Sequence, residues 1–197
     1  LFNGGCKVYT LPADSEGGAQ EFARLRRSLY DENALARAAQ AYAESAVASR
    51  AGATPAAHQA LVHQLQDASL LTLQRFAGSL APALGTPADA RSGLPAIAHH
   101  IESNIPEAER ALAGQYVMRM LTGSIWQLLQ DSRQQAGLSP LVDDEKARDY
   151  TVQMLTAIND SFAWPSPVIY TLQNFEQVQA SVFQITKGPG KWVVYLG

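Results

Sequence analysis

The sequence is poor in cysteine, in long apolar runs and in charge of one sign. Its single cysteine, Cys6, cannot form a disulfide within the chain. No apolar run approaches the roughly 20 residues that a membrane helix needs, so we expect no transmembrane segment. The formal net charge is only −3 and no long basic run occurs, which argues against a nucleic-acid partner.

Common motifs of cofactor binding and catalysis are absent as well. No glycine-rich dinucleotide fingerprint occurs, and the segment KGPGK lacks the P-loop pattern. The G-x-S-x-G motif of serine hydrolases is also missing. We therefore expect no cofactor, and the sequence favours a protein that is not an enzyme.

The amino-acid composition of the chain changes near Trp164. Ala, Gln, Leu and Arg, which favour helices, dominate before it, and Val, Ile, Tyr and Phe, which favour strands, dominate after it. Start signals and apolar residues at helical spacing predict five to six helices between about 16 and 162. Their ranges are 16–30, 32–50, 55–80, 95–104, 107–135 and 144–162.

Capping residues set the ends of several of these helices. Asp31 is expected to cap the second helix, Thr54 the third and Asp143 the last, because short polar side chains accept hydrogen bonds from a helix's first backbone amides. Gly137 is expected to end the fifth helix. Tyr116 belongs to the apolar face predicted for that helix.

The ends of the chain have the pattern of strands. SPVIYTLQNF, VQASVFQIT and KWVVYLG follow one another after residue 165, and CKVYTL lies at residues 6–11. We therefore predict an α+β fold in one domain spanning 1–197. Its helices pack on a small antiparallel sheet of three to four strands, built by the C-terminal meander at about 166–197 and the N-terminal strand.

Cys6 admits three interpretations. The stretch FNGGC resembles a lipoprotein cleavage site in its glycines, although Asn3 stands where such a site has an apolar residue. Cys6 would be a catalytic nucleophile if the fold brought His99 or His100 to it as a base. We favour the third interpretation, a small apolar residue that begins a strand. Contact with a membrane is expected only if Cys6 carries a lipid.

Two helices each offer a histidine and a carboxylate on one face. His63 and Asp67 are four residues apart, and His99 and Glu102 are three apart. If the two helices met, these four side chains would form a metal site of the kind found in helical bundles. The same spacing is common in ordinary surface pairs, which is the interpretation we favour.

Aromatic residues gather where the helical part ends. Phe162, Trp164 and Tyr170 surround two prolines. We favour a role in the core at this junction, because large aromatic side chains are often buried. The alternative is that Trp164 and Tyr170 line a groove for a partner.

These observations together favour a non-enzymatic bacterial binding or accessory protein of the cell envelope. It would act through contacts with another protein or with a small ligand. The excess of Arg over Lys and the abundance of Ala are typical of GC-rich bacterial genomes. The alternatives are a thiol-dependent enzyme that uses Cys6 with a histidine, and a helical metal-binding protein.

Overall fold

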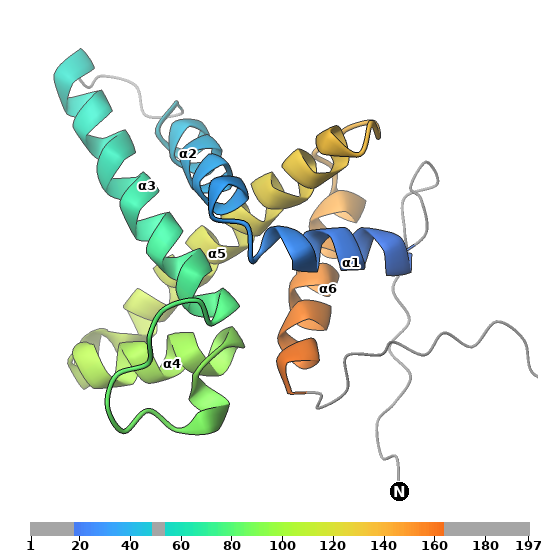
Figure 1. The fold of residues 1–197 in the computed structure, drawn as a ribbon. Coiled ribbons are helices and arrows are strands. Elements are labelled where there is room, and N and C mark those ends of the chain that lie inside the picture. Colours follow the sequence, from blue (N-terminus) through green and yellow to red (C-terminus); the bar gives the residue numbers. More distant parts are fainter. Residues whose placement is uncertain (1–17, 49–53, 164–197) are drawn as a thin grey trace, which may run out of the picture. The chain divides into compact units, whose positions relative to one another are not determined.

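The computed structural model describes residues 18–48 and 54–163. Within these ranges the chain forms six α-helices and one 3-10 turn, and about 80% of the described residues are helical (Figure 1). The helices are α1 (Gly18–Ser28), α2 (Glu32–Ala48), α3 (Pro55–Ala77), α4 (Gly93–Asn104), α5 (Glu107–Gln135) and α6 (Glu145–Phe162), with the 3-10 turn η1 at Ala88–Ala90. The chain divides after residue 165 into two units, and all of these helices belong to the first.

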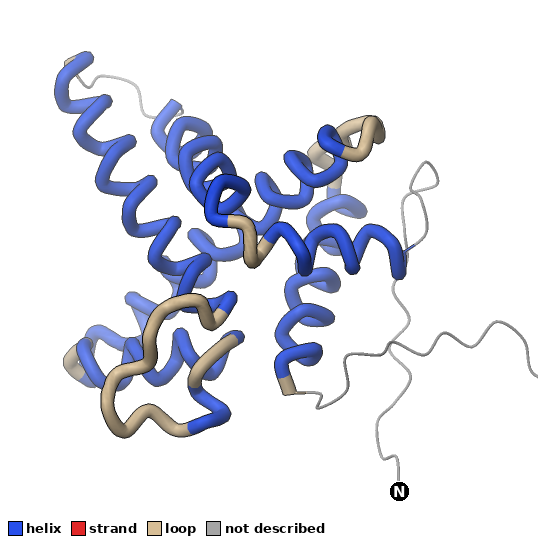
Figure 2. The backbone as a smooth tube through the Cα atoms, viewed as in Figure 1, coloured by secondary structure: helices blue, strands red, loops and turns tan. Residues whose placement is uncertain are grey.

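The predicted α+β fold is wrong for the described part of the chain. The predicted helices are present, but the described residues contain no strand (Figure 2). The helices bury most of their apolar side chains against one another, and no sheet takes part in the core of the described residues. The predicted strands at 6–11 and 166–197 lie outside the described residues, and the single domain spanning 1–197 therefore stays a prediction.

Two of the predicted helix caps are confirmed. The Asp31 Oδ1 atom accepts hydrogen bonds from the backbone amides of Asn33 at 3.0 Å and Ala34 at 3.4 Å. The Thr54 Oγ1 atom accepts one from the amide of Ala57 at 3.3 Å. Each satisfies amides that have no partner within the helix, which fixes where α2 and α3 begin.

The cap predicted for the last helix is wrong by one residue. Asp144, not Asp143, accepts the hydrogen bond from the amide of Ala147, at 2.8 Å. Asp143 instead accepts a hydrogen bond from Arg148 Nε at 2.8 Å on the surface. Two adjacent aspartates give the same capping signal in a sequence, and only the path of the backbone distinguishes them.

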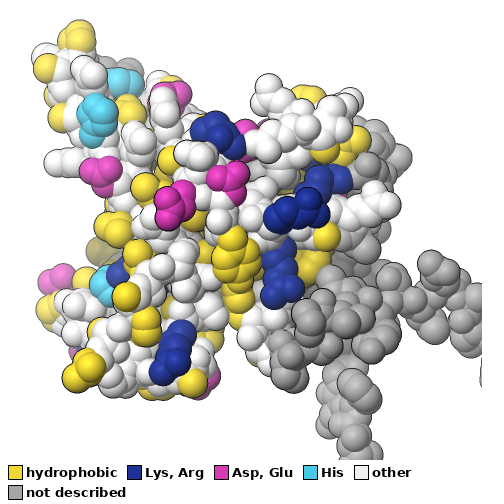
Figure 3. Space-filling view, viewed as in Figure 1, with side chains coloured by type: hydrophobic (Ala, Val, Ile, Leu, Met, Phe, Trp, Pro, Cys, Tyr) yellow, Lys and Arg dark blue, Asp and Glu magenta, His cyan; other side chains and the backbone are white. Residues whose placement is uncertain are grey.

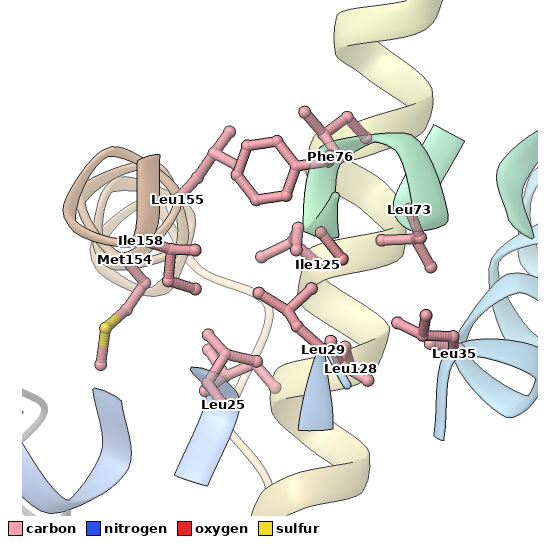
Figure 4. Close-up of a cluster of buried hydrophobic side chains, with 14 of the residues drawn as sticks. Leu25, Leu29, Leu35, Leu73, Phe76, Ile125, Leu128, Met154, Leu155 and Ile158 are labelled. Carbon is pink, nitrogen blue, oxygen red and sulfur yellow. The ribbon is translucent and has the colours of Figure 1, made fainter. Parts of the chain in front are cut away.

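The core forms around α5, which contacts each of the other five α-helices. Figure 4 shows the buried apolar side chains that meet there from α1, α2, α3, α5 and α6. They include Leu25, Leu29, Leu35, Leu73, Phe76, Ile125, Leu128, Met154, Leu155 and Ile158. Each contributes about 1.5–3 kcal/mol when fully buried, so this cluster is the main source of stability.

The first turn of α4 is attached to α6. Gly93 has a φ of 69°, which favours glycine, and a Cβ there would lie 2.7 Å from Asn159 Oδ1. That oxygen accepts a hydrogen bond from the amide of Leu94 at 2.8 Å. Asn159 therefore caps α4 from another helix and helps to fix the position of α4.

Candidate functional site

A groove of about 220 Å³ lies between α3, α4 and α5. Its lining is largely apolar and consists of Ala68, Leu71, Thr72, Arg75, Ile97, His100, Ile101, Val117 and Met120. Figure 3 shows hydrophobic, histidine and basic side chains lying side by side on the surface where α3 passes α4. The groove is the best candidate for a binding site in the described residues.

The sequence of α3 explains why one of its faces lines the groove. Ala68, Leu71, Thr72 and Arg75 recur at intervals of three and four residues, which places them on one side of a helix. The Thr72 hydroxyl donates to the Ala68 carbonyl at 2.8 Å, so its polarity is satisfied within the helix. The α3 wall is therefore apolar except at Arg75.

Arg75 and His100 are the two ionisable residues of the groove. Partial burial lowers the pKa of Arg75 from its usual value. The pKa of His100 is also lowered, first by burial and then by the positive charges of Arg75 and His99. Since a depressed pKa favours the neutral imidazole, the groove carries one positive charge near neutral pH and no acidic lining residue.

A neighbouring amide orients the His100 ring. Asn104 Nδ2 lies 3.0 Å from His100 Nδ1 and also donates to the His100 carbonyl at 2.8 Å. Because an amide nitrogen is a donor, this arrangement suits an imidazole whose Nδ1 accepts and whose proton is on Nε2. His100 then offers one N–H donor in its neutral form.

A second polar cluster is buried in the core and lies apart from the groove. Glu21 of α1 accepts a hydrogen bond from Arg133 Nη1 of α5 at 2.6 Å and another from the Tyr150 hydroxyl of α6 at 2.6 Å. The side chains of Glu21 and Arg133 are fully inaccessible. Burial and the bond to Glu21 raise the pKa of Tyr150 above its usual value. The cluster joins three helices and has no access to solvent, so its role is structural.

The predicted catalytic and partner-binding residues lie mostly outside the described part of the chain. Cys6, Trp164 and Tyr170 all fall there. His99 and His100 are described and are half-buried on α4. The pairing of Cys6 with a histidine therefore stays a prediction, as does a groove at Trp164 and Tyr170.

The predicted metal ligands are all described. His63 and Asp67 are exposed on α3, while His99 is half-buried and Glu102 exposed on α4. Among the residues that the structure describes, no three His, Cys, Asp or Glu side chains gather closely enough to hold a metal ion. The structure thus does not bring these four residues together, and elemental analysis of the purified protein is the test of that hypothesis.

Sequence reasoning missed the groove and the buried cluster. Glu21 and Arg133 are 112 residues apart, and no local pattern pairs them. The sequence did contain one sign of the groove. On one face of α3, a largely apolar stripe begins at Ala68 and ends at the cation Arg75. This stripe lines a groove only because α4 and α5 lie beside it, and their positions cannot be derived from the sequence of α3.

Comparison with known proteins identifies a family and nothing closer. None of the described helices combines the length with the hydropathy that a bilayer crossing demands. A family model described as "ResB-like family" matches residues 2–197. No curated protein and no solved structure matches the chain.

Proposed function

The chain belongs to the ResB-like family, and from this premise we propose that it binds another protein through the groove between α3, α4 and α5. Membership of this family indicates a broadly non-enzymatic accessory protein related to cytochrome c biogenesis. An accessory protein acts by contacting other proteins, so its function depends on the surface that makes these contacts.

The size and lining of the groove support a protein partner over a free small molecule. Its volume of about 220 Å³ is below the roughly 300–1,000 Å³ typical of small-molecule sites. One or two apolar side chains of a polypeptide suit a groove of this size. Leu71, which lines it, is 49% exposed, so apolar surface is available there for burial.

Further apolar side chains lie beside the groove on α5. Leu112 and Tyr116 are 55% and 62% exposed. They precede Met120, a lining residue, at intervals of four, so the three side chains form one stripe along the helix. This stripe extends the apolar surface beyond the groove, as the docking of a peptide segment or helix requires. The apolar groove next to exposed Leu71 is the observation that carries the proposal.

A matched pair of leucine variants tests the proposal in cells. Leu71→Asp places a charge in the groove, whereas Leu84→Asp changes a fully exposed leucine of the loop between α3 and η1. The measurement is the amount of c-type cytochrome with covalently bound haem, in cells whose own copy of the gene has been replaced by each variant.

We expect Leu71→Asp to lower the amount of assembled cytochrome several-fold and Leu84→Asp to leave it unchanged. Because Leu71 is half-exposed, its variant should fold, and equal protein abundance and thermal stability are the control. Normal cytochrome levels with Leu71→Asp would contradict the proposal.

A further inference from the structure

We infer that the partner segment in the groove carries a carboxylate beside its apolar residues, and that Arg75 pairs with this carboxylate. The inference rests on the proposed function, because it names the chemistry of the protein that the groove binds.

Arg75 differs from three other arginines of the described residues because it forms no ion pair with a described carboxylate. Three arginines form ion pairs with carboxylates of the described residues, namely Arg37 with Asp131, Arg133 with Glu21 and Arg148 with Asp143. Within the described ranges no carboxylate forms such a pair with Arg75. Yet Arg75 is half-buried and lines an apolar groove.

A half-buried arginine for which the described residues offer no counterion has an unfavourable environment. Removing a cation from water costs free energy unless an anion or hydrogen-bond acceptors replace the water. The C-terminal end of α3 offsets part of this cost, because its dipole is negative there. The dipole is no hydrogen-bond acceptor for the N–H groups of the guanidinium, whose forked arrangement matches a carboxylate.

The rest of the groove favours an anion and offers it no competitor. None of the groove's lining residues is acidic. His100 lies close enough for the charge of Arg75 to lower its pKa, and as a neutral ring it retains an N–H donor. An apolar segment with an Asp or Glu side chain, or with a free C-terminus, matches these features in both shape and charge.

The test uses a displayed library of random dodecapeptides as the probe. Peptides are selected for binding to the full chain, and in parallel to its Arg75→Gln, Arg91→Gln and Leu71→Asp variants. Arg91 is the matched control, since it is an exposed arginine that does not line the groove. The binding of single selected peptides is then measured with the carboxylate present and with it replaced by the amide.

For the wild-type chain and for Arg91→Gln, we expect selected peptides to combine apolar residues with Asp, Glu or a free C-terminus. Replacing that carboxylate by an amide should weaken binding about tenfold, as for a charge-assisted hydrogen bond. With Arg75→Gln the same replacement should have no effect, because the two changes remove one interaction.

The other outcomes overturn the inference in distinguishable ways. An acidic preference that persists with Arg75→Gln, or a library that yields no bound peptide, overturns the role assigned to Arg75. The proposed function then still stands or falls with the cytochrome measurement on Leu71→Asp. Peptides that bind Leu71→Asp as tightly as the wild-type chain would place binding outside the groove, which overturns both proposals.

Discussion

At the scale of single residues, the side chains of Glu21, Arg133 and Tyr150 form a hydrogen-bonded polar cluster inside the core. Both members of its ion pair are fully inaccessible, and Arg133 Nε also donates to the Ser139 carbonyl at 2.8 Å. A buried pair adds little net stability compared with apolar residues, but losing one partner leaves a charge without compensation. The cluster therefore fixes how α1 packs on α5 and α6.

Glu21→Gln should lower the free energy of unfolding by about 3 kcal/mol, because the buried charge of Arg133 would lose the carboxylate 2.6 Å from it. The matched control is Asp143→Asn, which breaks the exposed pair with Arg148 and should leave the stability nearly unchanged, because solvent screens such a pair. Urea unfolding followed by far-UV circular dichroism measures both values. Equal effects of the two variants would contradict a structural role for the cluster.

His100 gives a prediction that depends on pH. Its pKa in the folded chain is below the usual value of about 6.5, so the unfolded state binds more protons in the interval between the two values. Stability from this residue is fully present above about pH 6.5 and is lost as the pH falls through the pKa of the folded chain. The positive charge of Arg75 is one of the causes.

An NMR titration of the His100 ring measures this pKa directly. We expect a midpoint below that of histidine in an unstructured peptide, and we expect Arg75→Gln to move it back toward that reference. A midpoint at or above the reference would show that the groove does not disfavour the charged ring, and a midpoint that Arg75→Gln does not raise would show that the charge of Arg75 does not lower the pKa of His100.

At the scale of helices, the packing of α2 on α5 depends on one glycine. A Cβ at Gly123 would overlap Cε2 and Cδ2 of Tyr42, so the Tyr42 ring occupies the space that a side chain would take. A Cβ at Gly114, earlier on the same helix, would meet nothing within 4 Å. The two glycines thus differ in packing and share the same low helix propensity.

Gly123→Ala should lower the free energy of unfolding by about 1–3 kcal/mol, because the Tyr42 ring must move to admit the methyl group. Gly114→Ala should raise it by about 0.5–1 kcal/mol, because alanine favours the helix and nothing obstructs it. Thermal unfolding of both variants measures the difference. A stabilising Gly123→Ala would refute the close packing of α2 on α5.

Helices were predictable from the sequence because their signals are local. Asp31 and Thr54 cap where expected, and Leu73 and Phe76, within the predicted third helix, are fully buried. Tyr116 was expected on an apolar face and is 62% exposed. The buried residues of α5 begin only at Leu121, so its first half has an apolar stripe that the described helices leave partly uncovered.

At the scale of the whole molecule, the sequence could not predict how the helices meet. The sheet was inferred from the strand-like runs at 6–11 and after residue 165, whereas in the described part of the chain the other helices pack on α5. The groove brings together residues of three helices, among them Arg75 and His100, which are 25 residues apart in the sequence. Such contacts follow from the packing of helices. Helical periodicity in a sequence shows which face of a helix is apolar, but it does not show which other helix packs on that face.

We propose that this accessory protein of the ResB-like family meets a protein partner at the groove between α3, α4 and α5. The most direct measurement places a photo-crosslinking amino acid at position 71 or at position 152 of the full chain in growing cells. Leu71 and Val152 are 49% and 50% exposed, but Val152 lies on α6, away from the groove lining.

We expect position 71 to form a covalent adduct that mass spectrometry identifies as a component of cytochrome c assembly. Met120→Asp, which alters the facing wall of the groove, should abolish this adduct, and position 152 should form none. Partner binding at the groove would be excluded if position 71 formed no adduct, if position 152 formed the same one, or if the adduct survived Met120→Asp.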